Sequence, residues 1–284
     1  MRNIMSLSLA ALFGAMFMLV SCGGEAPKKS EPATTGQADA AAGGKAWSEI
    51  RVAIDTTYKP FTYKTPEGQP TGFDVDIASA LCQQLNVTCT FIEQAWDGMI
   101  PGLTAKKYDA IISSMSITAE RQKVVDFTGK YYNTPSCVIT MTTGSINTDY
   151  AAYSGMNIGV LKGSTQESFA QALLAPSGAN LLSYEGQDQV YLDIKSGRLD
   201  GTVADVLEVT GAFLNTPDGT GYGCTSPTLA SYVEHFGEGI GIAVRKEDPD
   251  LRNMLDGAIN KLRSNGEWQR ISDKYFPGVD IWGG

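Results

Sequence analysis

Short apolar runs rich in β-branched residues alternate with segments of helical periodicity, and this alternation constrains the fold more than any other feature of the sequence. The runs Val52–Asp55, Ile158–Leu161 and Ile240–Val244 have the length and composition of strands. Phe73–Leu85 instead repeats apolar residues at helical spacing. Strands that alternate with helices predict parallel sheets covered by helices on both faces, which is an α/β fold.

The same pattern continues through the rest of the chain. Further strands are expected at Val87–Ile92, Ala110–Ile112, Val138–Met141, Leu181–Tyr184 and Leu199–Ala204, and further helices at Met99–Ala105, from Thr118 onward, and at Thr165–Leu174, Gln189–Gly197, Val206–Leu214 and Asp248–Tyr275. Proline and glycine predict turns at 56–61 and 68–72. The stretch from Trp47 onward is long for one unit of this kind and predicts two lobes.

The N-terminal segment is predicted to direct export of the protein and to tether it to a membrane. Leu7–Val20 is an apolar run too short for a comfortable membrane-spanning helix, and it fits an export signal. It ends in Leu19-Val20-Ser21-Cys22, which resembles the lipobox of bacterial lipoproteins, so we expect residues 1–21 to be cleaved and Cys22 to carry lipid. An ordinary cleaved signal with an unmodified cysteine is the alternative. Residues 22–46 lack aromatic and branched aliphatic side chains and are expected to form a flexible tether.

The cysteine pattern supports export. Once Cys22 is set aside, four cysteines remain, and an even number suits an oxidising compartment. Cys82 and Cys89 lie on either side of a predicted helix-to-strand corner, which favours a disulfide between them. Cys137 and Cys224 remain as a pair by elimination, and a disulfide or two buried free thiols are both open for them.

Charge and composition exclude several classes of function. The chain has 31 acidic and 22 basic residues and a net charge of −9, which argues against nucleic acid as a partner. Its single histidine, His235, and the absence of a Cys-x-x-Cys motif argue against a histidine triad and the common metal sites. We therefore expect neither a metal ion nor a cofactor.

Polar side chains follow four of the expected strands. These clusters are Asp55 with Tyr58, Ser113–Ser116, Gly163–Glu167, and Asp205. Ligands of open α/β sheets bind at the carboxyl ends of the strands, so the four clusters form the candidate site. Each also has a structural alternative. Ser164 and Glu167 match a helix capping box, and the two aspartates could cap a turn or a helix.

Arg121 is placed in the first turn of a helix that Thr118 begins, where a cation opposes the helix dipole. A residue placed against local electrostatics often has another partner. Because the guanidinium fork binds a carboxylate in bidentate geometry, Arg121 is a candidate for the carboxylate of a ligand. The alternative is a solvated arginine paired with Glu120 or Asp126.

Several segments in combination resemble a known family. They read RVAIDTTYKPF, GFDVDIASALCQQL, WDGMIPGLTAKKYDAIISSMSITAERQKVVDFT, IGVLKGSTQE and GRLDGTVAD. The chain from about Ile50 onward is similar to the periplasmic amino-acid-binding proteins of ABC importers (solute-binding protein family 3), in particular to the lysine/arginine/ornithine- and histidine-binding group. The Cys82/Cys89 pair matches the disulfide of that group.

The resemblance implies a type II periplasmic-binding fold, in which two α/β lobes are joined by a two-strand hinge. The first lobe is expected at 47–132 and 238–284, the second at 137–228, and the hinge crossings at 133–136 and 229–237.

The resemblance also implies a role for individual residues. The α-carboxylate of an amino acid is expected at Arg121, Ser116 and Thr165, its α-ammonium at Asp205 and Ser114, the end of its side chain at Asp55, Ser113 and Gln166, and its aliphatic stem between Tyr58, Trp96 and Leu161. This chain departs from the group at two positions. Trp96 replaces the usual Phe, and Ala204 replaces a frequent Gln.

The charges of the expected site indicate its ligand. Asp55, Asp205 and Arg121 leave one uncompensated negative charge, which a zwitterion with a cationic side chain would neutralise. Arginine is expected first, then lysine or ornithine, then histidine. Glutamine or another polar amino acid is the alternative.

The resemblance further implies a monomeric binding protein, not an enzyme, that closes its lobes on the ligand and docks on the permease subunits of an ABC transporter. It would lie in the periplasm or on the outer face of the cell envelope, held to a membrane by Cys22. A dehydratase on the same scaffold is a further alternative, although no obvious acid–base pair accompanies Arg121. A sensory module of a receptor is the third alternative, after a glutamine-binding protein and a dehydratase.

Overall fold

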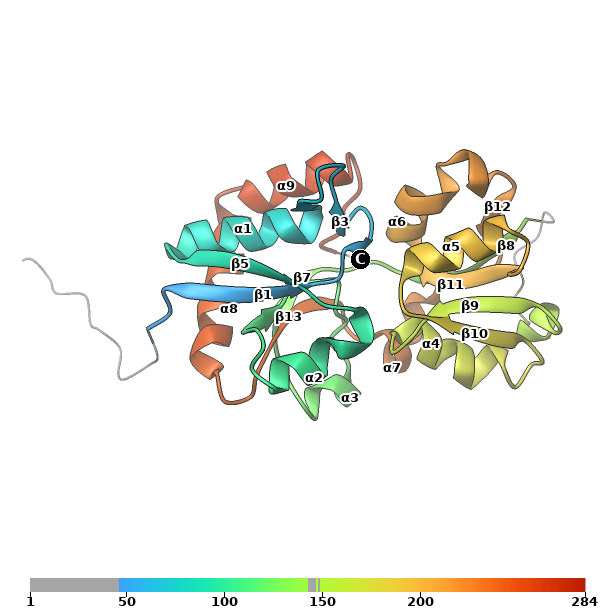
Figure 1. Cartoon of the computed structure of the whole chain (residues 1–284), viewed down its shortest axis with the longest axis horizontal. Helices are drawn as coiled ribbons and strands as arrows, with labels where there is room; N and C mark the ends of the chain where they lie inside the picture. The colour runs from blue at the N-terminus through green and yellow to red at the C-terminus, as the bar shows by residue number, and fades with distance from the viewer. Residues whose placement is uncertain (1–45, 143–146, 148, 284) are drawn as a thin grey trace, which may run out of the picture. The chain divides into compact units, whose positions relative to one another are not determined.

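The computed structural model describes residues 46–142, 147 and 149–283. The predicted signal peptide, the predicted lipidation site Cys22 and residues 23–45 of the predicted tether lie outside the described residues. The part from residue 46 onward belongs to one compact unit, which contains two five-stranded sheets, each with its own helices (Figure 1). We call these two sheets with their helices lobe 1 and lobe 2. Within the described residues, no helix combines the length and the apolar character needed to span a bilayer.

The sheet of lobe 1 has the strand order β5-β1-β6-β13-β7. These strands are β1 (Glu49–Ile54), β5 (Thr88–Glu93), β6 (Ala110–Ile111), β7 (Asp126–Tyr132) and β13 (Ile240–Val244). β1 pairs in parallel with β5 and β6, whereas β13 is antiparallel to both of its neighbours. The expected parallel sheet is therefore mixed. The sequence pattern also missed β7 as a strand.

The sheet of lobe 2 has the order β10-β9-β11-β8-β12. Its strands are β8 (Ser136–Met141), β9 (Asn157–Leu161), β10 (Asn180–Tyr184), β11 (Gly201–Asp205) and β12 (Tyr222–Cys224). β9 is parallel to β10 and β11, and β8 is antiparallel to β11 and β12. As in lobe 1, a single strand runs against the other four.

The two reversed strands have one cause. β8 and β13 are the first strands that the chain forms after it crosses from one lobe to the other. A chain that leaves a parallel sheet does so at the carboxyl ends of its strands, and it enters the facing sheet at the equivalent edge. It must therefore run against the parallel strands there. The return connection between β12 and β13 carries two short helical segments, η6 (Leu229–Ser231) and α7 (Val233–Phe236).

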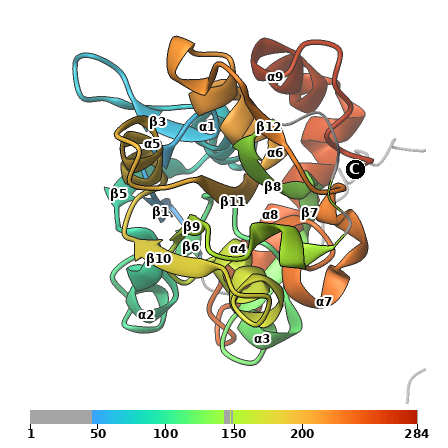
Figure 2. The same ribbon diagram turned by 90° about the vertical axis from the view of Figure 1, so that its right-hand side faces the viewer.

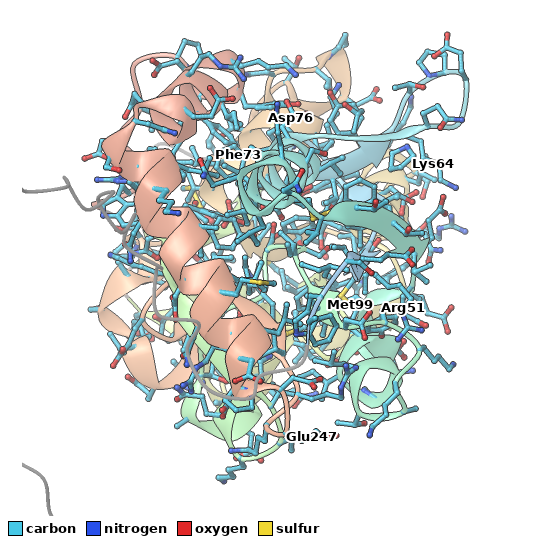
Figure 3. The ribbon with its side chains drawn as sticks, turned by 90° about the vertical axis from the view of Figure 1, so that its left-hand side faces the viewer. Arg51, Lys64, Phe73, Asp76, Met99 and Glu247 are labelled. Carbon is cyan, nitrogen blue, oxygen red and sulfur yellow. A yellow bond between two sulfur atoms is a disulfide. The ribbon has the colours of Figure 1, made fainter. Side chains whose placement is uncertain are left out.

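Helices cover both faces of the lobe 1 sheet because its strands alternate their buried side chains. Val52 and Ile54 of β1 pack in a core with α1 (Phe73–Leu85), α8 (Pro249–Ser264) and α9 (Glu267–Tyr275). Ala53 points to the other face, toward η1 (Trp96–Gly98) and α2 (Met99–Thr104). Figure 3 shows α8 running beside α1, which carries Phe73 and Asp76. The Nζ of Lys274 in α9 pairs with the Asp76 carboxylate at 2.6 Å.

Lobe 2 is built in the same way. α5 (Gln187–Lys195) and α6 (Val206–Val209) cover one face of its sheet and α4 (Thr165–Phe169) covers the other (Figure 2). α4 continues into η3 (Ala170–Leu174) and α6 into η4 (Thr210–Leu214), and both continuations are π-helical. The remaining short helical turns are η2 (Tyr150–Tyr153) and η5 (Pro217–Gly219).

A small antiparallel sheet in lobe 1 takes two of its three strands from the stretches expected as turns. It consists of β2 (Thr57–Tyr58), β3 (Thr62–Lys64) and β4 (Pro70–Thr71). Elsewhere in lobe 1, α3 (Ala119–Gln122) begins after Thr118 as predicted but is only four residues long.

Both predicted cysteine pairs are bonded. Cys82–Cys89 joins α1 to β5, which confirms the expected corner disulfide. Cys137–Cys224 joins β8 to β12, which resolves the choice that the sequence left open. Together with the two sheets, these bonds confirm the predicted fold class of two α/β lobes. The exact lobe boundaries remain a prediction.

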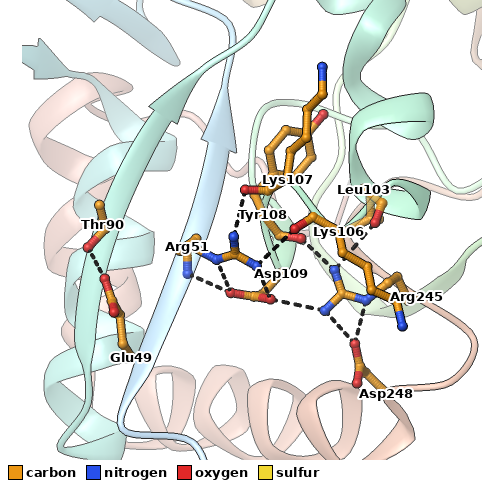
Figure 4. A network of polar contacts seen from close by, with 10 residues as sticks. All are labelled: Glu49, Arg51, Thr90, Leu103, Lys106, Lys107, Tyr108, Asp109, Arg245 and Asp248. Atoms are coloured by element: carbon orange, nitrogen blue, oxygen red, sulfur yellow. Dashed lines mark hydrogen bonds and ion pairs between the residues drawn. The ribbon is translucent and has the colours of Figure 1, made fainter.

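A partly buried ion network lies at the amino-terminal ends of β1 and β6 in lobe 1 (Figure 4). The Asp109 carboxylate accepts hydrogen bonds from Arg51 Nε at 2.9 Å and from Arg245 Nη2 at 3.0 Å. Arg245 is 4% exposed and also pairs with Asp248 at 2.6 Å. Burial opposes ionisation of Asp109, but the hydrogen bonds from the two arginines outweigh it and lower its pKa to about 2. The network ties β1, β6 and β13 together at the edge opposite the candidate site.

Candidate ligand-binding site

A cavity of about 440 Å³ lies between the two lobes, at the carboxyl ends of β1, β6, β9 and β11. Every residue predicted for the site except Arg121 lines it. These residues are Asp55, Tyr58, Trp96, Ser113, Ser114, Ser116, Leu161, Thr165, Gln166 and Asp205. Asn133, Thr134 and Ser136 also line the cavity, although they were not predicted for the site. They lie between the end of β7, the strand that the sequence pattern missed, and the start of β8.

Asp55 ends β1 and is 4% exposed. Its Oδ1 accepts hydrogen bonds from the N–H and the hydroxyl of Thr57, at 2.9 and 2.8 Å, and its own N–H donates to Ser113 Oγ at 3.0 Å. Burial raises the pKa of Asp55, and the bonds from Thr57 partly offset this effect. Asp55 thus caps the turn at Thr57, as the structural alternative predicted, and its carboxylate also lines the cavity.

Asp205 supplies the second cavity carboxylate, from lobe 2, and is 5% exposed. It is the N-cap of α6, because its Oδ1 accepts from the N–H groups of Leu207 and Glu208 at 2.9 and 3.0 Å. The hydroxyl of Thr134 donates to the same oxygen at 3.0 Å. Burial raises the pKa of Asp205 to about 7, against the effect of these hydrogen bonds.

The guanidinium of Arg121 lies beside the cavity and reaches from lobe 1 to lobe 2. Its Nη1 donates to the Ser116 carbonyl at 3.0 Å, and its Nη2 donates to the Gly163 carbonyl at 3.4 Å. Its Cζ lies 5.3 Å from the centroid of the Trp96 ring, which is a cation–π contact. Burial lowers the pKa of Arg121 to about 10.

The alternative partners of Arg121 are engaged elsewhere. Glu120 pairs with Lys123, and Asp126 pairs with Lys246 and Arg252. The interpretation of Arg121 as a surface arginine paired with either acid is therefore wrong.

The loop between β9 and α4 also combines capping with cavity lining. Ser164 Oγ accepts from the Glu167 N–H at 3.0 Å, and Glu167 Oε2 accepts from the Gly163 N–H at 2.7 Å. Ser164 thus has both of the roles considered for its cluster, since it caps α4 and also lines the cavity. On the first helical turn, Gln166 Nε2 donates to Ser136 Oγ at 3.1 Å, which links the loop to the hinge.

Asp74 is a residue of this region that the sequence analysis missed. It lies in the first turn of α1, is fully buried, and accepts hydrogen bonds from Ser114 Oγ at 3.0 Å and from the Tyr131 hydroxyl at 2.8 Å. Tyr132 donates to Ser114 Oγ at 2.7 Å, so Ser114 is held from two sides at a φ of 54°. Burial raises the pKa of Asp74 to about 7. The only sequence signal for Asp74 was an acidic residue between the apolar Phe73 and Val75. That signal is weak, because acidic residues are common in the first turn of a helix.

A second buried carboxyl group lies next to Asp205. Glu208 is fully buried, and the Tyr191 hydroxyl donates to it. Burial raises its pKa well above the usual range, the charge of Asp205 adds to this effect, and the hydrogen bond from Tyr191 opposes it. This direction favours the neutral form of Glu208, and neither Glu208 nor Asp74 lines the cavity, whereas Asp55 and Asp205 do.

A cavity between two α/β lobes, with one carboxylate from each lobe and the guanidinium of Arg121 from lobe 1 beside it, defines a two-lobed protein that binds small molecules. Among residues 46–142, 147 and 149–283, no cluster of three or more His, Cys, Asp or Glu side chains has the geometry of a metal site. Residues 50–278 match the family described as bacterial extracellular solute-binding proteins, family 3, and the chain belongs to this family.

Two relatives illustrate the range of the family. The chain is 46% identical over 234 residues to the L-arginine-binding protein of Pseudomonas aeruginosa, an alignment that covers 82% of this chain and 90% of the relative. It is 40% identical over 236 residues to the histidine-binding periplasmic protein of Salmonella typhimurium, covering 83% and 90%. These relatives are binding proteins, not enzymes.

Solved structures share the fold. An ancestral arginine-binding protein bound to arginine superposes with a TM-score of 0.73 at 28% identity, covering 81% of this chain and 98% of the other. An ancestral amino-acid-binding protein described as a precursor of cyclohexadienyl dehydratase superposes with a TM-score of 0.70 at 29% identity, covering 81% and 96%.

Proposed function

We propose that this protein binds a basic L-amino acid outside the cytoplasm and delivers it to the permease subunits of an ABC transporter. L-Arginine is the preferred ligand, followed by lysine or ornithine and then histidine. The observation that carries the proposal is the pair of buried carboxylates, Asp55 and Asp205, which face one cavity from different lobes with Arg121 beside them. The names of the relatives support the same ligand class.

The proposed pose assigns each part of arginine to a group of opposite charge. The α-carboxylate lies at Arg121, Ser116 and Thr165, the α-ammonium at Asp205 and Ser114, and the guanidinium at Asp55, Ser113 and Gln166. The aliphatic stem lies between Tyr58, Trp96 and Leu161. In this pose Arg121 exchanges its bond to the neutral Gly163 carbonyl for a stronger bond to the ligand carboxylate, in which donor and acceptor are both charged.

Charge balance favours a cationic side chain over a neutral one. With both carboxylates ionised, Asp55, Asp205 and Arg121 sum to one negative charge, and arginine brings one positive charge. Glutamine would leave Asp55 without a counter-charge, and an unpaired buried charge is strongly destabilising. Glutamine is therefore the alternative that a ligand screen must exclude.

Ligand binding is coupled to lobe closure in this proposal. The ligand touches Asp55 on lobe 1 and Asp205 on lobe 2, and it can make both sets of contacts only when the lobes are shut. A ligand that gains contacts in one state shifts the population to that state. The shut monomer is then the form that the permease recognises.

The proposal extends to the N-terminal segment. Cleavage after residue 21 and lipidation of Cys22 would hold the protein on the outer face of a membrane or in the periplasm. Residues 22–46 would then be a flexible tether that lets the lobes move away from the lipid anchor. Mass spectrometry of the N-terminal peptide tests this directly. Cys22→Ser is expected to release the protein into the soluble fraction, and retention of that variant on the membrane would contradict the anchor.

Native mass spectrometry of the purified protein, followed by calorimetry with arginine, lysine, ornithine, histidine and glutamine, tests the ligand. We expect a co-purified basic amino acid and the tightest binding for arginine. Tighter binding of glutamine than of every basic amino acid would refute the ranking. Incubation with prephenate and arogenate tests the dehydratase alternative, and we expect no turnover.

A further inference from the structure

An ion pair joins the two lobes beside the cavity. Lys162, which follows β9 in lobe 2, places its Nζ 2.8 Å from the Oδ2 of Asp97 in η1 of lobe 1. The side chains are 52% and 34% exposed, and neither residue lines the cavity. Each directly follows a residue that does, Leu161 for Lys162 and Trp96 for Asp97. The pair therefore lies just outside the two side chains that are proposed to enclose the ligand stem.

The backbones of the lobes also approach at this point. A methyl group on Gly163 would lie 3.7 Å from the Asp97 Cα and 3.9 Å from the Trp96 ring, which is van der Waals contact. The φ of Gly163 is +73°, a conformation that favours glycine. The Gly163 carbonyl is also the acceptor for Arg121. Two contacts between the lobes, Lys162–Asp97 and Arg121–Gly163, thus converge on one loop at which the backbones also lie close together.

We propose that Asp97 and Lys162 pair only when the lobes are closed, and that they thereby determine ligand affinity without touching the ligand. The inference rests on the proposed function, since it assumes that closure accompanies binding. A contact present in one of two states favours that state, and the apparent affinity rises with the population of the competent state.

The expected size of the effect follows from the surroundings of the pair. Exposed ion pairs are weak, and part of the gain is lost because Lys162 also lies in the field of Glu167 and Glu185 on its own lobe. We expect Lys162→Gln to weaken arginine binding roughly two- to fivefold, mainly through faster dissociation. Asp97→Asn is expected to have the same effect, and the double variant no more than either single change.

Calorimetry on the full chain measures these affinities, and the pair Lys195–Asp218 provides the matched control. Its Nζ–Oδ2 distance is 2.9 Å and its exposed fractions are 58% and 43%, but both residues belong to lobe 2. Lys195→Gln and Asp218→Asn are therefore expected to leave affinity unchanged. The charge-reversed double variant Asp97→Lys/Lys162→Asp is expected to recover affinity relative to Asp97→Lys alone. Fully additive losses in the Asp97/Lys162 cycle, or equal losses in the control pair, would overturn the inference.

A ligand-free measurement separates this inference from the ligand assignment. Spin labels on the two lobes report the distribution of open and shut forms without any amino acid. We expect Lys162→Gln to shift that distribution toward longer distances, and Lys195→Gln to leave it unchanged. If the wild type binds no basic amino acid, the proposed function fails while this shift still tests the ion pair. An unchanged distribution in Lys162→Gln refutes the ion pair whatever the ligand is.

Discussion

Asp55 and Asp205 differ in the number of hydrogen bonds that their carboxylate oxygens accept from the protein. Asp205 Oδ1 accepts three hydrogen bonds, two of which cap α6. Asp55 Oδ1 accepts two, both from the adjacent Thr57. Substitution of Asp205 would therefore disturb α6 as well as the ligand, whereas substitution of Asp55 changes mainly one turn. Asp55 is the cleaner position at which to test the ligand assignment.

Asp55→Ala is expected to weaken arginine binding by a hundredfold or more. The reason is that removal of one partner of a buried ion pair costs about 3–5 kcal/mol. Calorimetry measures the loss. Asp188→Asn serves as a control, because it removes a nearby carboxylate that is exposed and does not line the cavity. Unchanged arginine affinity in Asp55→Ala would overturn the role of Asp55, and an equal loss in Asp188→Asn would indicate a long-range field instead.

Arginine affinity is expected to depend on pH because burial raises the pKa of Asp205 to about 7 in the empty site. Below that pH a proton competes with the ligand ammonium, so affinity falls with decreasing pH, by up to about tenfold per pH unit. Titrations in buffers of different ionisation enthalpy would detect the released proton. Asp74, whose pKa is also about 7, faces the same region, so Asp74→Asn distinguishes the two groups. If Asp205 is responsible, the pH dependence persists in that variant.

Protonation has the opposite effect on the stability of the empty protein. The folded state holds the Asp205 proton more tightly than the unfolded chain, in which the pKa is near 3.8. This residue therefore lowers the free energy of unfolding as the pH rises from about 4 to 7.

At the scale of elements, the two ends of the lobe 1 strands β1 and β6 have different roles. The cavity lies at their carboxyl ends, whereas Arg51, Asp109 and Arg245 connect the strands at the opposite end of the sheet. Function and stability are thus assigned to opposite ends of the same strands, and they can be perturbed separately.

Arg245→Met is expected to lower the free energy of unfolding by about 3 kcal/mol, because it leaves the buried Asp109 with one arginine and removes the donor to the Tyr108 carbonyl. Denaturant unfolding measures the loss, and arginine affinity is expected to be unchanged. Lys195→Gln, which breaks an exposed pair, is expected to stay within about 0.5 kcal/mol. Equal stability in Arg245→Met would show that the network is not stabilising.

The elements that sequence periodicity could predict are those whose pattern is local. The helix Phe73–Leu85 and the strand Ile240–Val244 have the predicted bounds, because the helix repeats its apolar residues at regular spacing and the strand is a continuous buried run. The direction of β13 was not accessible in this way, since an antiparallel and a parallel strand buried on both faces have the same composition. Its reversal follows from the crossing between lobes, which is a property of the whole chain.

The same distinction applies to the site. Strand ends and the family resemblance predicted ten of the residues that line the cavity, since both depend on local motifs. Asp74 and the Lys162–Asp97 pair were missed because their partners are distant in sequence: Asp74 meets Ser114 and Tyr131 only after α1 packs on the sheet.

For the whole molecule, ligand binding and stability are expected to be coupled. A ligand that binds only the folded state raises the free energy of unfolding by about 4 kcal/mol at a thousand times its Kd. Arginine is therefore expected to raise the Tm, with lysine and ornithine raising it less at equal concentration. Thermal-shift measurements with glutamine provide the comparison. A larger shift with glutamine than with arginine would contradict the charge argument.

Lobe 2 is one continuous stretch of chain placed between β7 and β13, whereas lobe 1 needs segments from both sides of it. During synthesis, every strand of lobe 2 emerges before β13, α8 and α9 are available to lobe 1. The inserted lobe can thus fold first, while the earlier-made lobe waits for its last strand and two helices. Loss of the chain's final segment would leave lobe 1 incomplete and lobe 2 with all of its strands.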